Sequence, residues 1–139
     1  MDTEEIIREK LGDCINHIDN NLQILHIKGY WIEEHLVVQH GEGNIPSVQN
    51  TITLNGVPHD NNYIVTSAEL YFNDDNPKER PWFNHTQKRI YACYPKGDFE
   101  RILSIINQYP KNLEIMFHDC ILTNQTWVKI YCNNPNMII

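Results

Sequence analysis

Alternation of apolar and polar residues with a period of two is the feature that most constrains the fold of this chain. It runs through TITLNG, residues 51–56, and through NYIVTSAELYFN, residues 62–73. The stretch between them, NGVPHDNN, is rich in turn-forming residues. We therefore predict a β-hairpin in this part of the chain.

Other stretches predict further strands and two helices. LQILHI, beginning at Leu22, is typical of a strand, and Lys28 and Gly29 are expected to break it. The next segment, residues 30–43, fits a helix or a strand, and we favour the strand. Strands are also predicted over residues 88–95, 113–124 and 126–134, the last two as a second hairpin, and helices over residues 2–20 and 98–109.

This order of elements predicts an α+β fold. We expect a mostly antiparallel sheet of about six or seven strands, with the N-terminal helix and the second helix packed on one face. A chain of 139 residues has the size of one domain, so residues 1–139 are expected to form a single globular unit.

The first residues and the cysteines bear on location. MDTEEIIREK is acidic and has no apolar signal region, and no later stretch approaches the roughly 18 apolar residues of a membrane span. We therefore expect a cytoplasmic protein. The cysteines, Cys14, Cys93, Cys120 and Cys132, show no CxxC pairing, so all are expected to be reduced. Neither a metal ion nor a cofactor is expected to be bound.

The charge is distributed unevenly along the chain. Residues 1–77 hold thirteen acidic side chains against three basic ones, and residues 78–139 hold eight basic against five acidic, which gives balances of −10 and +3 and a total of −7. A duplex-binding protein needs a broadly basic face, so duplex nucleic acid is not an expected partner. An acidic surface favours a basic protein partner, and Glu33, Glu34, Asp74 and Asp75 are its expected acidic face. The alternative is that the acidic residues merely solvate the first helix and its neighbours.

The segment from Asn73 to Arg89 lacks clear periodicity and is longer than most connections, as functional loops often are. It contains RPWFNHTQKR, in which Arg and Trp are residue types enriched at binding hot spots. We predict a binding site formed by Arg80, Trp82, Phe83, His85, Lys88 and Arg89. The alternative is that Trp82 and Phe83 fold back onto the core and leave the polar side chains as an exposed rim.

Catalytic motifs are absent from the sequence. It contains no G-x-S-x-G, no P-loop, no H-E-x-x-H and no G-x-G-x-x-G pattern. FHDC, residues 117–120, brings together His118, Asp119 and Cys120, but neighbouring side chains on a strand point to opposite faces. We expect these residues to be structural and the protein not to be an enzyme.

Two classes of function follow from the sequence. The first is an acidic protein that antagonises another protein, such as an immunity protein for a toxin or a mobile-element or phage inhibitor of a host enzyme. The second is a binder of an anionic small molecule such as a nucleotide, through the basic and aromatic segment 78–101. In that case Arg80, Lys88, Arg89, Lys96 and Arg101 are expected to meet phosphate groups, while Trp82, Phe83, Tyr91 or Tyr94 stacks a base. A small hydrolase is a more remote alternative, and the oligomeric state is left open.

Overall fold

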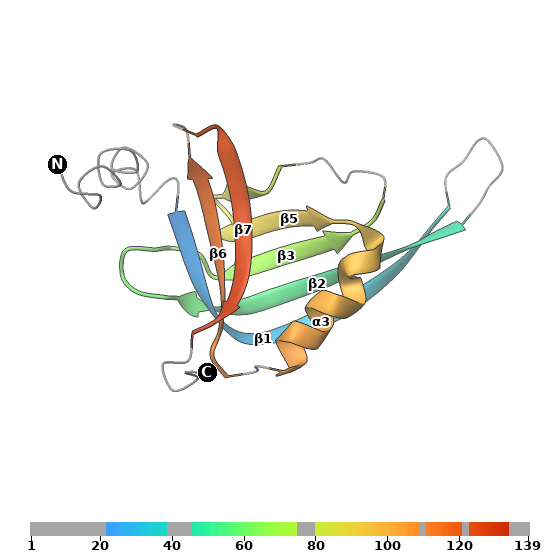
Figure 1. Ribbon diagram of the computed structural model, residues 1–139, viewed down its shortest axis with the longest axis horizontal. Coiled ribbons are helices and arrows are strands. Elements are labelled where there is room, and N and C mark those ends of the chain that lie inside the picture. Colours follow the sequence, from blue (N-terminus) through green and yellow to red (C-terminus); the bar gives the residue numbers. More distant parts are fainter. Residues whose placement is uncertain (1–21, 39–45, 75–79, 109–110, 121–122, 134–139) are drawn as a thin grey trace.

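The computed structural model of the chain describes residues 22–38, 46–74, 80–108, 111–120 and 123–133. Its described strands form one sheet in the order β4-β5-β3-β2-β1-β6-β7 (Figure 1). The strands are β1 (Leu22–Val38), β2 (Pro46–Pro58), β3 (Ser67–Phe72), β4 (Trp82–Asn84), β5 (Arg89–Tyr94), β6 (Leu113–Cys120) and β7 (Gln125–Cys132). A 3-10 turn, η2 (Lys96–Asp98), leads into the helix α3 (Phe99–Gln108).

The predicted α+β class is wrong. Strands dominate the described part of the chain, and one short helical segment, η2 with α3, accompanies them. The predicted helix over residues 98–109 is confirmed as α3, whereas the predicted helix over residues 2–20 lies outside the described residues. The sheet is also mixed, because β3 and β5 run parallel while the other neighbouring strands are antiparallel.

The parallel pair arises from the path of the chain after β3. The chain passes to β4 at the edge of the sheet and then returns through a tight turn into β5, which lies between β3 and β4. Residues 82–84 therefore form a strand within the segment that we expected to be an irregular loop. The two predicted hairpins are confirmed as the antiparallel pairs β2–β3 and β6–β7.

β1 and β2 form a long antiparallel pair that extends past the other strands. Their register runs from Leu25↔Pro58 to Val38↔Pro46, whereas β3 joins β2 only from Asn50 onward. The outer part of the pair is thus a two-stranded ribbon that projects from the sheet (Figure 1). The break expected at Lys28 and Gly29 is a β-bulge between Ile27 and Gly29 inside one continuous strand.

The hydrophobic core lies against one face of the sheet, which we call the inner face. Ile102 and Ile106 of α3 are buried there, and β4 contributes Phe83. Within the described residues, the one α-helix is too short to cross a membrane. The largest fully buried apolar side chains are Phe72, Leu25, Ile52, Leu54, Leu70, Ile90, Ile106, Leu113, Ile115 and Val65.

Candidate functional site

The opposite face of the sheet, which we call the outer face, carries polar and aromatic side chains. The strand registers place Trp31 opposite Thr53, Thr53 opposite Glu69, Glu69 opposite Tyr91, and Tyr91 opposite Trp82. These residues form one row across five neighbouring strands, β1-β2-β3-β5-β4, and we call it the cross-strand row. Its two tryptophans are the exposed ends, with 46% of Trp31 and 45% of Trp82 accessible to solvent.

The bulge in β1 determines that Trp31 lies on the outer face. Before the bulge, Leu25 and Ile27 face the core, and after it Tyr30 pairs with the buried Leu54. One extra residue in a strand reverses which residues face each side. Without the bulge, Trp31 would therefore lie on the inner face, away from Trp82.

The aromatic rings at the β4 end of the row are stacked. The ring centroids of Trp82 and Tyr91 are 4.4 Å apart with an angle of 12° between the ring planes. Tyr71, on the next strand, lies 6.3 Å from Tyr91 with an angle of 11°. This packing restricts the rotamers of all three rings, so Trp82 is held in place despite its exposure.

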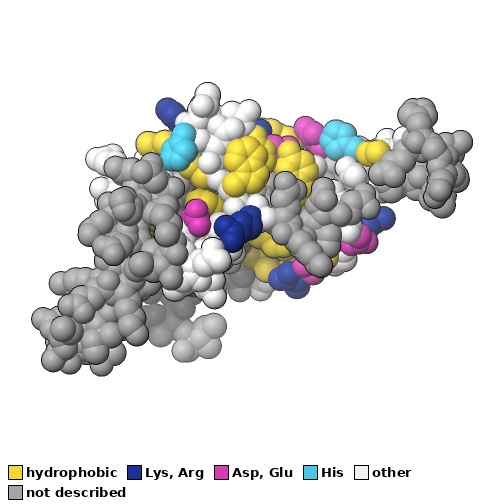
Figure 2. All heavy atoms as spheres, turned by 90° about the horizontal axis from the view of Figure 1, so that it is seen from above, with side chains coloured by type: hydrophobic (Ala, Val, Ile, Leu, Met, Phe, Trp, Pro, Cys, Tyr) yellow, Lys and Arg dark blue, Asp and Glu magenta, His cyan; other side chains and the backbone are white. Residues whose placement is uncertain are grey.

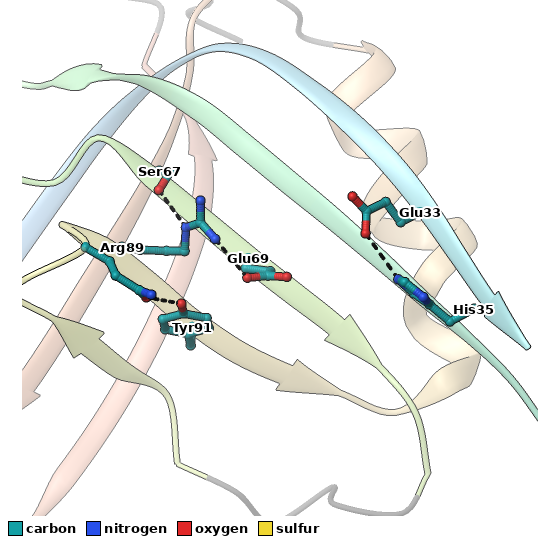
Figure 3. Close-up of polar contacts among 7 residues, drawn as sticks. Glu33, His35, Ser67, Glu69, Arg89 and Tyr91 are labelled. Carbon is teal, nitrogen blue, oxygen red and sulfur yellow. Dashed lines mark hydrogen bonds and ion pairs between the residues drawn. The ribbon is translucent and has the colours of Figure 1, made fainter. Parts of the chain in front are cut away.

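Two charged pairs lie on the outer face, Arg89 with Glu69 and His35 with Glu33 (Figure 3). Arg89 donates from Nε to Ser67 Oγ at 2.9 Å and from Nη1 to Glu69 Oε2 at 3.1 Å. Burial, followed by a hydrogen bond to Glu69, raises the pKa of Tyr71 to about 12. Arg89 is thus already neutralised, which leaves it poorly suited to binding a phosphate group.

A groove of about 570 Å³ lies beside the stacked rings. Its described lining combines aromatic rings, carboxamides, one guanidinium and one thiol. These residues are Gln49, Tyr71, Asn73, Arg80, Trp82, Asn84, Gln87, Tyr91 and Cys93. Figure 2 shows the molecule from the top of Figure 1. Hydrophobic side chains gather on this surface, and charged and histidine side chains lie around them.

The predicted loop site is divided between the two faces of the sheet. Trp82 and Arg80 line the groove, whereas Phe83 is only 9% exposed and belongs to the core. His85 is exposed and stands edge-on to Phe83, with ring centroids 4.9 Å apart. Lys88 is exposed and adopts a φ of 56° in the turn before β5. Phe83 thus packs onto the core, whereas Trp82 stays on the surface where it can contact a ligand. The two residues differ because adjacent residues of a strand point to opposite faces.

The predicted acidic face is not assembled in the described structure. Glu33 accepts a bond from His35 Nε2 at 3.1 Å on the outer face of the ribbon. Glu34 points to the other face, opposite Asn50, and Asp74 accepts the backbone N–H of Lys96 at 3.0 Å. Asp75 lies outside the described residues.

The FHDC segment holds three separate structural contacts. His118 stands edge-on to Trp127 at 5.2 Å, and burial lowers the pKa of its imidazole. Asp119 accepts a hydrogen bond from Thr126 Oγ1 at 2.9 Å. Cys120 is disulfide-bonded, so the prediction that all four cysteines are reduced is wrong. Cys93 and Cys132 are not in disulfides.

Glu114 forms a second polar cluster that the sequence did not indicate. Its carboxylate is 1% exposed, with Oε2 at 2.5 Å from His59 Nδ1 and 3.8 Å from His26 Nδ1. Oε1 accepts a bond from Asn133 Nδ2 at 2.8 Å. Burial and Glu114 together raise the pKa of Tyr131. Both carboxylate oxygens are engaged, so we assign this cluster the role of joining β6 to β1 and to the β2–β3 connection.

Several residues of the site were missed from the sequence. Trp31 was hidden by the bulge, and Gln49, Asn84 and Gln87 are polar residues of a common type. Tyr71 could have been found, because Glu69 and Tyr71 alternate with the apolar Leu70 and Phe72 in β3.

No protein-family model, curated protein or solved structure matches this chain. The described residues also contain no group of three or more His, Cys, Asp or Glu side chains suited to holding a metal ion.

Proposed function

We propose that the protein is a small binding protein without catalytic activity that antagonises another protein by docking its outer sheet face onto it. An immunity protein for a toxin and a mobile-element or phage inhibitor of a host enzyme are the two forms of this proposal. The supporting observation is the cross-strand row, which ends in an exposed tryptophan on each side.

The dimensions of the row suit a protein partner. Four strand spacings of about 4.8 Å separate Trp31 from Trp82, so the row is roughly 19 Å long. A protein–protein interface of standard size covers about 800 Å² on each partner, and such a row spans much of that patch. Tryptophan, tyrosine and arginine are the residue types that dominate binding energy at these interfaces.

The net charge of the whole molecule contributes more to attracting a partner than the charged groups of the outer face do. The pairs Arg89–Glu69 and His35–Glu33 are closed within the face, whereas the chain as a whole carries a net charge of −7. A basic partner would be attracted over a distance of about 10 Å at 0.1 M salt and then held by the aromatic side chains. The proposed partner is therefore a protein with a basic surface.

A cytoplasmic location remains a prediction. The disulfide at Cys120 is more typical of an oxidising compartment.

The test is affinity capture from the source cell, followed by calorimetry with the purified partner. Trp31→Ala and Trp82→Ala should each weaken binding by about 2 kcal/mol or more, as truncation of a hot-spot residue does. Trp127→Ala is the matched control, because Trp127 is 37% exposed on β7 and lies outside the row. Full affinity in both row variants would exclude the cross-strand row as the binding surface.

A further inference from the structure

We infer that the groove beside Trp82 binds a planar aromatic anion of the nucleoside monophosphate class. This site goes beyond the proposed protein docking, because it is a separate hollow within the outer face and has its own hydrogen-bonding character. The inference rests on the ring geometry at the sheet edge and on which polar atoms of the lining are already engaged.

The ring of Trp82 offers a stacking surface. One face of the indole packs on Tyr91 at a centroid distance of 4.4 Å. Among the described strands, β4 is a terminal one, so none of them lies beyond Trp82 to cover the other face. Any of the nucleobases can stack on such an exposed, fixed ring, because every base has a flat aromatic face.

Two carboxamide side chains of the groove, Asn84 and Gln87, can donate hydrogen bonds to a ligand. Asn84 Oδ1 accepts the backbone N–H of Gln87 at 3.0 Å, and Gln87 Oε1 accepts the hydroxyl of Tyr91. With these oxygens engaged, the amide N–H groups of Asn84 and Gln87 are left to meet a ligand. The lining therefore favours a ligand rich in hydrogen-bond acceptors.

Arg80 supplies the positive charge. Its Nη2 donates to Asn124 Oδ1 at 3.2 Å, and a guanidinium has four further N–H donors. No carboxylate is among the described residues that line the groove. An anionic group such as a phosphate monoester thus finds a cation and amide donors beside a stacking ring.

The other basic side chains of residues 78–101 that the sequence suggested as phosphate ligands are either paired with an acidic group or lie outside the groove. Arg89 is bound to Glu69, and Arg101 lies 3.5 Å from Asp98. Lys88 and Lys96 are not among the residues that line the groove. Arg80 is consequently the phosphate-binding residue of this site, and the volume of about 570 Å³ is within the range of small-ligand pockets.

The test is calorimetric titration of the purified protein with AMP, GMP, CMP and UMP. The matched nucleosides and inorganic phosphate serve as separate probes of stacking and of anion binding. We expect saturable binding of the monophosphates, at least tenfold weaker binding of the nucleosides, and still weaker binding of inorganic phosphate.

Variants locate the site. Arg80→Ala and Trp82→Ala should each weaken monophosphate binding about tenfold or more, while Lys111→Ala, an exposed cation outside the groove, should leave it unchanged. Absence of saturable binding at millimolar concentration, or an equal loss in Lys111→Ala, would overturn the inference. Because no protein partner is present, this result is independent of whether the proposed docking holds.

Discussion

Trp31 and Trp82 lie at opposite ends of one row of side chains, although they belong to strands that are not neighbours in the sheet. Their alignment depends on the bulge in β1, since the residues after it have the opposite facing from those before it. The β-bulge therefore places Trp31 on the surface that we propose to bind a partner.

Gly56 should be indispensable to this bulge. A Cβ atom at Gly56 would lie 1.9 Å from the backbone oxygen of His26, so the two strands would have to separate. We expect Gly56→Ala to cost about 2 kcal/mol or more of unfolding free energy, in the range of overpacked core sites. Urea denaturation measures this cost.

Gly29→Ala is the control for that experiment. A Cβ atom there would meet only the side chain of Asn55, at 3.7 Å or more, which is an ordinary contact. Its effect should stay within about 0.5 kcal/mol. Equal losses in both variants would show that the close approach at Gly56 is not what the bulge requires.

Trp82 and Phe83 are neighbours with opposite roles, and truncation should separate them. Phe83→Ala removes a buried ring and should cost about 3 to 5 kcal/mol of unfolding free energy. Trp82→Ala removes a half-exposed ring that stacks on Tyr91, so its cost should be about 1 kcal/mol. A comparable loss of stability in the two variants, measured by thermal or urea unfolding, would contradict the separation of faces.

Local patterns predicted the longer elements of the fold. The alternation in residues 51–56 and 62–73 is visible because each strand has one buried face, and the helix 98–109 has clear apolar periodicity and a proline stop. β4 has three residues, which is too few for any period to show, so Trp82 and Phe83 could not be assigned to a face.

Other features depend on contacts between distant parts of the chain. The parallel pairing of β3 with β5 places Glu69 beside Tyr91, and no local pattern reveals that choice. Arg89 was expected to bind a ligand, but the same pairing brings it to Glu69 and Ser67. The groove likewise joins Gln49 of β2 to Arg80 and Trp82, so its composition became visible only with the sheet order.

Tyr71 should ionise late in an alkaline titration. Its pKa of about 12 exceeds the ordinary value of 10.0, so the folded state holds this proton more tightly than the unfolded chain. The resulting contribution to stability is present below pH 10 and is lost as the pH rises toward 12. Burial also raises the pKa of Tyr131, so the late part of the tyrosinate absorbance should become smaller by one tyrosine in Tyr71→Phe and should not disappear.

Glu69→Gln separates the two main causes of the raised Tyr71 pKa, which are burial and the hydrogen bond to Glu69. The change removes a carboxylate that accepts the tyrosine hydroxyl, so the pKa of Tyr71 should fall. It should remain above 10.0, because burial is the larger cause. An unchanged late step in Glu69→Gln would mean that the carboxylate does not contact Tyr71 in solution.

His118 should make the protein less stable in mild acid. Burial against Trp127 lowers its pKa below 6.5, and the charge of Asp119 opposes this effect. As the pH falls through 6.5 the unfolded chain takes up this proton first, so unfolding becomes easier until the folded imidazole also titrates. His118→Gln should remove this part of the acid dependence, measured as unfolding free energy between pH 7 and pH 5. An identical pH profile in the variant and the wild type would contradict the assignment.

The disulfide at Cys120 should appear in a count of thiols. The sequence has four cysteines, of which Cys93 and Cys132 are not disulfide-bonded and Cys120 is. A thiol assay under denaturing conditions should therefore find two groups before reduction and four after it. Cys120→Ser should then raise the count before reduction from two to three, since the former partner thiol is released. Four thiols in the unreduced wild-type protein would show that the disulfide does not form, and would restore the expectation of a reducing compartment.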